Sequence, residues 1–85
     1  MGSKRLRRPS NRIKKVLANN VVDLRTSMSL SQEQLAEKSG LHRTYIGAVE
    51  RRERNVTLST LEALARALEV NVVQLLNEDN LDDDF

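Results

Sequence analysis

The 85-residue sequence contains no cysteine and no tryptophan, and it has one tyrosine, one phenylalanine and one histidine. Without cysteine the chain has no disulfide and no thiolate ligand, and a single histidine does not make a metal site. We therefore expect no metal and no cofactor. With so few aromatic residues, the core must be built from aliphatic side chains, which favours helices packed on helices over a β-sandwich. A chain of this length is expected to form one domain.

Long apolar runs are also absent from the sequence. No run approaches the roughly 18 residues of a membrane-spanning helix, and no signal-peptide core is present. We therefore expect a cytoplasmic protein with no membrane partner. Without a cysteine nucleophile or a phosphate-binding loop, and with one histidine, the sequence also argues against an enzyme.

Charge is unevenly distributed along the chain, although the formal net charge is only +2. Residues 1–15 carry seven basic groups and no acid, whereas residues 78–85 carry five acids and no base. We interpret residues 1–10 as a basic arm that follows nucleic-acid phosphates, residues 11–77 as the folded domain, and residues 78–85 as an acidic tail. The alternative is a solvated arm with no partner. The basic side chains of the arm are Lys4, Arg5, Arg7 and Arg8.

Apolar spacing and capping residues predict five helices. The first is expected to be capped by Ser10 or Asn11, ends near Ser27, and has an apolar stripe of Ile13, Leu17, Val21, Leu24 and Met28. Ser31 and Asn71 each begin a capping box with a glutamine three positions later. Thr57 is expected to cap the fourth helix, and the fifth is expected to end near Asn77. The predicted apolar face of the fourth helix is Leu58, Leu61, Leu64, Ala65 and Leu68.

Residues 31–51 predict two short helices that meet at a tight turn. Their inward positions are apolar: Leu35, Ala36, Leu41, Ile46 and Val49. Gly40 falls between the two helices, where a sharp turn needs a positive φ. The outward positions of the second helix are then available to a partner: Arg43, Thr44, Gly47 and Ala48.

This spacing resembles the helix-turn-helix of the phage repressor and Cro-like transcription regulators. The matching words occur in order between about Leu17 and Leu76: SQEQLA from Ser31, Gly40-Leu41, RTYI from Arg43, Glu50-Arg51, and Leu61 to Leu68. The segment RTYIGAVERRERNVTLSTLEALARAL is also similar to the controller proteins of restriction–modification systems. The resemblance implies an all-α, compact five-helix bundle of the lambda-repressor-like DNA-binding type, with its helix-turn-helix at residues 31–50. Such relatives usually end the first helix with glycine, where this chain has Ser29.

A DNA-recognition helix lies in the major groove with its N-terminal residues against base edges. We therefore predict base contacts from Arg43, Thr44 and Ala48. Arginine can pair bidentately with guanine, threonine can donate or accept a hydrogen bond, and an alanine methyl can pack on a thymine methyl. A solvated surface position is the alternative for Arg43 and Thr44. Because Arg43 would be the one strong polar reader, DNA shape is expected to supply part of the specificity.

Contacts to the DNA backbone are predicted from residues around the recognition helix. Gln32 opens the preceding helix, where free N–H groups attract a phosphate, and the family uses a glutamine here to grip the backbone. His42 is expected to be a neutral cap or a phosphate contact, and Tyr45 to pack on the preceding helix or reach a phosphate. Arg52, Arg54 and Asn55 come from the loop after the recognition helix, and for them the alternative is a solvated loop with no DNA contact. The predicted set is Gln32, His42, Tyr45, Arg52, Arg54 and Asn55.

The resemblance also assigns a structural ion pair between Arg25 and Glu50, which would fix how the recognition helix is presented. One helix-turn-helix covers few base pairs, so we expect a homodimer whose recognition helices lie about 34 Å apart on a pseudo-palindrome. The expected dimer interface is Val56, Val70, Val72, Val73 and Leu76, although each also has a plain interpretation as a core residue.

The sequence therefore predicts a sequence-specific regulator of transcription, such as a repressor, whose partners are double-stranded DNA and a second copy of itself. Its most specific form would be an autoregulating controller of a restriction–modification operon. The alternative is an antitoxin-type interaction module that neutralises a partner toxin and binds its own promoter. That alternative is weaker, because little of the sequence lies outside the expected bundle to form a neutralising segment.

Overall fold

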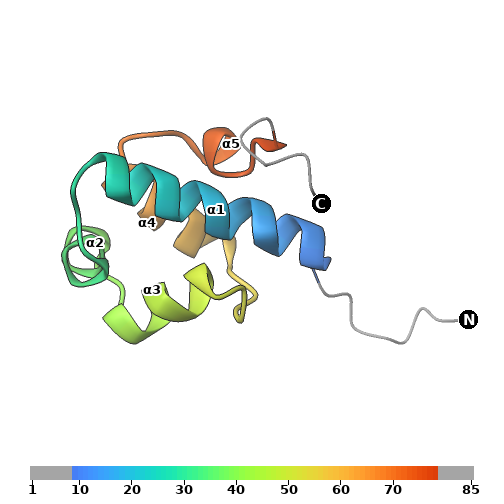
Figure 1. Ribbon diagram of the computed structural model, residues 1–85, viewed down its shortest axis with the longest axis horizontal. Helices are drawn as coiled ribbons and strands as arrows, with labels where there is room; N and C mark the ends of the chain where they lie inside the picture. Colours follow the sequence, from blue (N-terminus) through green and yellow to red (C-terminus); the bar gives the residue numbers. More distant parts are fainter. Residues whose placement is uncertain (1–8, 79–85) are drawn as a thin grey trace, which may run out of the picture.

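The computed structural model describes residues 9–78, and these residues form five helices. They are α1 (Asn11–Ser27), α2 (Gln32–Ser39), α3 (Arg43–Glu50), α4 (Leu58–Ala67) and α5 (Val72–Leu75). In Figure 1, α1 runs across the molecule, with α2 at its C-terminal end, α3 below it and α5 above it. The all-α fold and the helix-turn-helix predicted at residues 31–50 are confirmed. The predicted arm residues Lys4, Arg5, Arg7 and Arg8, and the tail beyond residue 78, lie outside the described residues.

The first helix begins and ends where the sequence predicts. Ser10 is its N-cap, and the Ser10 hydroxyl accepts a hydrogen bond from the Ile13 amide at 3.2 Å. At the other end, Ser29 has φ +59°, in the left-handed region that favours glycine. The chain therefore takes the backbone conformation of a glycine-terminated helix with a serine in that position.

Capping interactions also fix the turn between α2 and α3. The Ser31 hydroxyl accepts from the Gln34 amide at 3.0 Å, and the Gln34 side chain accepts from the Ser31 amide at 2.8 Å. Gly40 ends α2 with φ +76°, as its place in the turn predicts. Nδ1 of His42 accepts from the Thr44 amide at 3.1 Å, so His42 is the N-cap of α3. Of the two roles expected for His42, the cap is confirmed.

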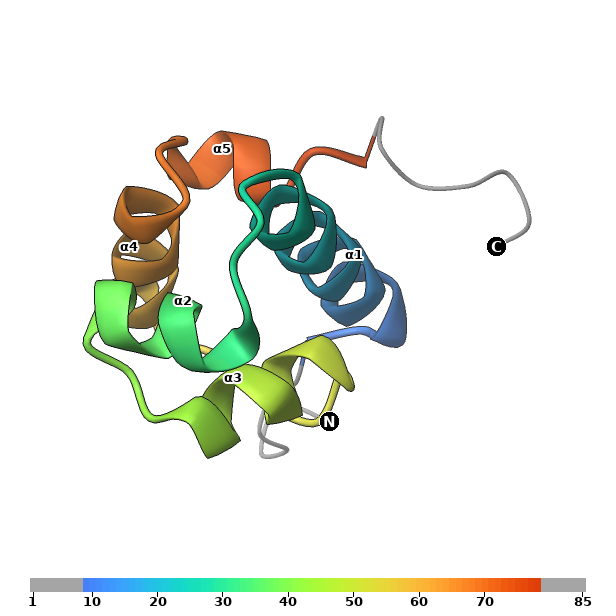
Figure 2. The same ribbon diagram turned by 60° about the vertical axis from the view of Figure 1, so that its left-hand side comes forward.

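The core lies between the helices and is aliphatic, as the composition requires. Figure 2 shows α1 and α4 on opposite sides of it, with α2 and α3 toward the viewer and α5 above. The largest fully buried apolar side chains are Leu35, Ile46, Leu64, Leu75, Val16 and Val21. One buried polar residue, Asn20, connects α1 to the end of α5, because its Nδ2 donates to the carbonyls of Leu75 at 2.8 Å and Asn77 at 3.1 Å.

Two expectations about the last two helices are wrong. Leu58, assigned to the buried face of α4, is 78% exposed. It is the first residue of α4, and helical side chains lean toward the N-terminus, so its side chain projects past the end of the helix. The fifth helix ends at Leu75, two residues before the expected Asn77, and Asn20 donates hydrogen bonds to the Leu75 carbonyl and to the Asn77 carbonyl beyond the helix.

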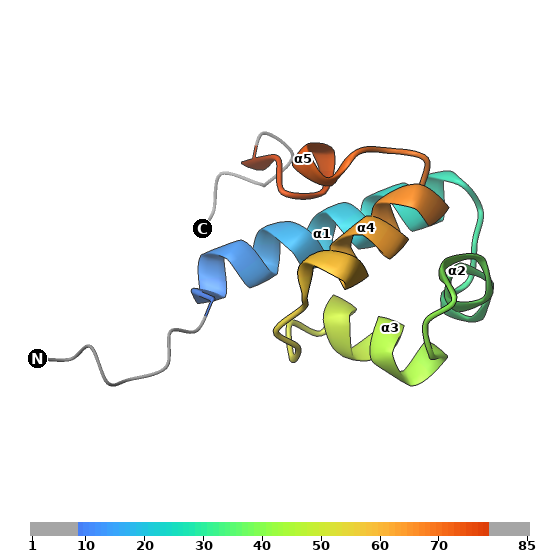
Figure 3. The same cartoon turned by 180° about the vertical axis from the view of Figure 1, so that it is seen from behind.

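From behind, α4 lies in front of α1, and the chain returns above them through α5 (Figure 3). The described chain ends beside its own beginning, because Nε of Arg12 donates to Oε1 of Glu78 at 3.2 Å and Nη2 contacts the same oxygen. Within residues 9–78, no helix has the length and apolar character that a membrane span requires.

Candidate nucleic-acid interface

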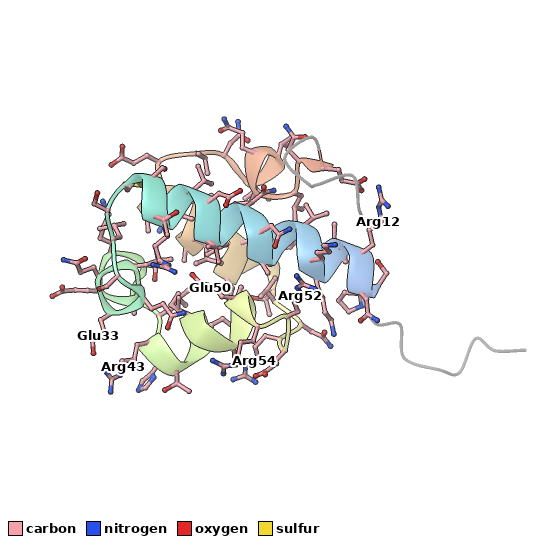
Figure 4. The ribbon with its side chains drawn as sticks, in the orientation of Figure 1. Arg12, Glu33, Arg43, Glu50, Arg52 and Arg54 are labelled. Carbon is pink, nitrogen blue, oxygen red and sulfur yellow. The ribbon has the colours of Figure 1, made fainter. Side chains whose placement is uncertain are left out.

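The start of α2 and the outer face of α3 border a hollow of about 600 Å³. Its lining residues come from α1, α2, α3 and their caps: Arg25, Ser31, Gln32, Glu33, Arg43, Thr44, Gly47 and Arg51. The predicted base readers Arg43 and Thr44 are both exposed on this face. Figure 4 shows the Arg43 side chain beside Glu33 at the outer end of α3. The start of α3 is therefore the part of this helix that is open to a partner.

Arg43, Gly47 and Arg51 form a line along the face of α3 that borders the hollow, but Gly47, which the sequence placed outward, is itself buried. They are four residues apart, and this spacing keeps helical side chains on one face. Nη1 of Arg51 lies 3.0 Å, and Oε1 of Gln32 3.5 Å, from the position that a Cβ at residue 47 would take. Both polar side chains therefore reach over the backbone of α3 because Gly47 has no side chain.

Arg51 was not among the predicted DNA contacts, although its neighbours Arg52, Arg54 and Asn55 were. Arg51 is the C-cap of α3 and lines the hollow together with Arg43. Its Nε donates to Oε2 of Glu53 at 3.1 Å, and its side chain is exposed. The spacing of eight residues from Arg43 is the sequence signal that would have placed it on the same face.

Ala48 does not have the outward orientation that the sequence predicted. It is 9% exposed, belongs to the buried residues of α3, and does not line the hollow. The prediction treated every position outside the Ile46 and Val49 stripe as free, but the neighbouring elements cover more of this short helix than that stripe. The structure thus gives no support to a base contact from Ala48.

The predicted ion pair between Arg25 and Glu50 is confirmed. Nε and Nη2 of Arg25 donate to the two carboxylate oxygens of Glu50 at 2.7 and 3.0 Å, and the side chains are only 14% and 7% exposed. Nη1 of Arg25 donates to the Leu30 carbonyl at 2.8 Å. These bonds join α1, the start of α2 and the end of α3, so the pair fixes the orientation of α3 in the bundle.

Glu50 has a second partner that the sequence did not predict. Nε2 of Gln32 donates to Oε1 of Glu50 at 2.8 Å. The side chain expected to grip the DNA backbone is therefore held against the end of α3, at the edge of the hollow. Its exposed position at the first turn of α2 agrees with the expected geometry for a phosphate contact.

An ion pair across the turn connects the two short helices. Oε2 of Glu33, on the first turn of α2, accepts from Nη1 of Arg43, the first residue of α3. The first turn of α3 has no acidic residue of its own. Glu33 thus places a carboxylate next to a cation that the positive end of the helix dipole disfavours.

The loop after α3 presents three exposed polar candidates, Arg52, Arg54 and Asn55. The guanidinium carbon of Arg54 lies 4.8 Å from the centre of the Tyr45 ring, a cation–π arrangement. Tyr45 is half-buried against the core, and its ring supports Arg54. Arg52 and Arg54 lie at the opposite end of α3 from Arg43 (Figure 4).

The five residues expected at a dimer interface differ in exposure. Val56, Val70, Val72 and Leu76 are partly buried and pack against the core, whereas Val73 is 76% exposed. Val73 and Leu58 are the exposed large apolar side chains of the described chain. Four of the five therefore contribute to the core while keeping part of their surface exposed, and Val73 is available to a partner.

A short exposed helix with arginine and threonine at its start, braced by a second helix behind it, is how helix-turn-helix regulators present side chains to the major groove. Comparison with known protein families agrees with this class. Residues 22–75 match the helix-turn-helix family, and the chain belongs to it.

The chain is similar to control proteins of restriction–modification systems. It is 64% identical to the control protein C.SmaI of Serratia marcescens over 69 residues, which are 81% of this chain and 82% of the relative. The crystal structure of the restriction–modification controller protein C.AhdI from Aeromonas hydrophila matches with a TM-score of 0.71 and 44% identity, over 73% of this chain and 94% of that one.

A third relative has been solved with DNA. The controller protein C.Esp1396I, as a tetramer in complex with its natural 35 base-pair operator, matches with a TM-score of 0.69 and 36% identity, over 74% of this chain and 83% of that one. The comparisons support a DNA-binding transcription regulator. They do not support the antitoxin alternative.

Proposed function

We propose that this protein is a sequence-specific transcription regulator that binds a pseudo-palindromic operator as a homodimer and controls a restriction–modification operon. The observation that carries the proposal is the exposed start of α3, where Arg43 and Thr44 lie beside Gln32 over a hollow of about 600 Å³. The similarity to the control protein C.SmaI supports the assignment to a restriction–modification system. The proposal includes a cytoplasmic location, where operator DNA is found, and a non-enzymatic role.

Arg43 and Thr44 are the proposed base contacts, and the surrounding residues the proposed backbone contacts. Gln32 and the free amides at the start of α2 would meet a phosphate on one side of the groove. The exposed loop after α3 would meet the other side. The proposed backbone set is Gln32, His42, Tyr45, Arg52, Arg54 and Asn55, to which the structure adds Arg51 as a candidate because it lines the hollow.

Two copies are needed for a site long enough to be specific. We propose that they meet around α5 and the end of α4, where Val73 is exposed beside the partly buried Val70, Val72 and Leu76, with Val56 nearby. Sedimentation at micromolar concentration is expected to give a dimer that Val73→Glu converts to a folded monomer. A wild-type monomer at that concentration would contradict the proposed surface.

Selection of bound DNA from a random pool, followed by a salt titration, tests the function. A two-fold symmetric site is expected, with a log–log salt slope of several phosphates. Arg43→Ala should remove the preference at one base pair per half-site, whereas Arg54→Ala should weaken binding to all sequences more evenly. If the protein selects no common sequence, the proposed function is wrong.

A further inference from the structure

A carboxylate lies directly beside the proposed base reader. Glu33 forms an ion pair with Nη1 of Arg43, and both side chains line the hollow that DNA would enter (Figure 4). Both are well exposed, at 65% and 64%. A negative charge at such a place repels phosphates, so Glu33 lowers affinity for DNA of every sequence. Because the Glu33 carboxylate weakens attraction to DNA, any contribution that it makes to DNA binding must come through its contact with Arg43.

The ion pair leaves part of the guanidinium available. Within residues 9–78, Nη1 of Arg43 is held by Glu33, while Nε and Nη2 make no hydrogen bond. A guanidinium has five N–H donors in a fixed plane, so a carboxylate can occupy one edge while another edge meets O6 and N7 of a guanine. A side chain that is already held loses less rotamer freedom when it docks.

We propose that Glu33 is a positioning residue for base recognition. Its carboxylate orients the guanidinium of Arg43 toward one guanine in each half-site, and its charge penalises binding elsewhere. Glu33 thus raises discrimination between sequences while it lowers affinity for unrelated DNA. This inference rests on the proposed function, and it deepens that function by naming the residue that controls the proposed reader.

A purely structural role for the pair makes a different prediction. The carboxylate of Glu33 relieves the unfavourable placement of the Arg43 cation at the start of α3. If that were its only role, removing the charge would change stability and leave base preference unaltered. Base preference is therefore the measurement that separates the two roles.

Glu33→Gln is the test variant, and Glu37→Gln is its matched control. Glu37 is exposed on the same helix, carries the same charge and does not line the hollow. Binding is measured to the selected operator, to an operator changed at the Arg43 base pair of both half-sites, and to unrelated DNA. Glu33→Gln is expected to raise affinity for unrelated DNA several-fold and to lower the ratio between the two operators about tenfold. Glu37→Gln is expected to leave that ratio unchanged.

Three results would overturn the proposal. The first is an unchanged operator ratio in Glu33→Gln, with thermal unfolding showing that the variant is folded. The second is a fall in the ratio that persists in an Arg43→Ala background, because Glu33 would then act independently of Arg43. The third is a wild-type protein with no preferred site, which overturns the proposed function as well, whereas the first two leave that function intact.

Discussion

Arg25 and Glu50 form a two-bond ion pair at 2.7 and 3.0 Å between α1 and the last residue of α3. Both groups are largely buried, and the third guanidinium nitrogen of Arg25, Nη1, donates to the Leu30 carbonyl. The same carboxylate holds Gln32 at 2.8 Å. One glutamate therefore sets the orientation of the recognition helix and the position of the glutamine proposed to grip the DNA backbone.

Removing one partner of this pair should destabilise the fold strongly. Arg25→Ala is expected to lower the free energy of unfolding by about 3–5 kcal/mol, because it leaves a buried carboxylate without its cation. Chemical denaturation measures the loss. Arg66→Ala, on the exposed face of α4, is the control and should change stability by less than about 0.5 kcal/mol. The double variant Arg25→Met/Glu50→Met should recover part of the lost free energy of unfolding. If Arg25→Ala lost less stability than the control Arg66→Ala, the structural role of the pair would be contradicted.

Ser29 should be replaceable by glycine with a gain in stability. Its φ of +59° costs an L-residue roughly 1 kcal/mol that glycine does not incur. Ser29→Gly is therefore expected to raise the free energy of unfolding by about 1 kcal/mol in denaturant melts. Ser27→Gly, two residues earlier and inside α1, should instead lower it by about 0.5–1 kcal/mol. If both variants shifted stability in the same direction, the explanation from backbone conformation would fail.

The features predicted correctly depend on residues that are close in sequence. The capping boxes at Ser31 and Asn71 each join positions three apart, and the glycine turn at Gly40 depends on one residue's conformational freedom. Apolar spacing likewise predicted the helices, because a helix places every third or fourth side chain on one face. Arg25 and Glu50 were predicted through the family resemblance, which supplies a contact between residues that local patterns do not connect.

The features that sequence reasoning missed depend on which elements meet in space. Asn20 hydrogen-bonds to carbonyls more than fifty positions away, and no local pattern connects them. The exposed Leu58 and the covered Ala48 show the same limit, because periodicity gives the face of a helix but not what covers that face. Arg51 was missed although the end of α3 at Glu50 was predicted correctly, because the packing that brings its side chain over Gly47 is not visible in the sequence.

Stability should fall at acidic pH through the ion pair that holds the end of the described chain. The hydrogen bond from Arg12 lowers the pKa of Glu78 below its ordinary value of 4.5, and the same bond raises the pKa of Arg12. A carboxyl whose folded-state pKa is depressed contributes stability above its unfolded pKa and loses it as the pH falls through the folded value. The contribution of Glu78 should therefore be complete at neutral pH, begin to decline near the ordinary carboxyl pKa, and be lost as the pH falls through the lower folded-state pKa.

Thermal unfolding of the wild type and of Glu78→Gln across this pH range measures the effect. The difference between the two proteins should be present at pH 7 and shrink as the pH falls below the ordinary carboxyl pKa. Glu62→Gln, at an exposed position on α4, provides the comparison for loss of a single negative charge. A difference that stayed constant from neutral to strongly acidic pH would show that the Arg12–Glu78 pair does not form in solution.

Gly47 should separate stability from DNA binding. An alanine there gains about 0.5–1 kcal/mol of helix propensity, and its Cβ would meet Nη1 of Arg51 at 3.0 Å and Oε1 of Gln32 at 3.5 Å. Both atoms are at the ends of flexible side chains, so they can move without unfolding the helix. Gly47→Ala is thus expected to unfold at the same denaturant concentration as the wild type or a higher one.

The same substitution should weaken operator binding about tenfold, because it displaces the Arg51 side chain, a proposed DNA contact, and adds a methyl group to the face that borders the hollow. Gly40→Ala is the opposite case. No atom lies within 4 Å of its added Cβ, but its φ of +76° is unfavourable for alanine. It should lose about 1–2 kcal/mol of stability, while operator binding by the protein that remains folded is unchanged. Full operator affinity in Gly47→Ala would mean that DNA does not approach α3 along the line from Arg43 to Arg51.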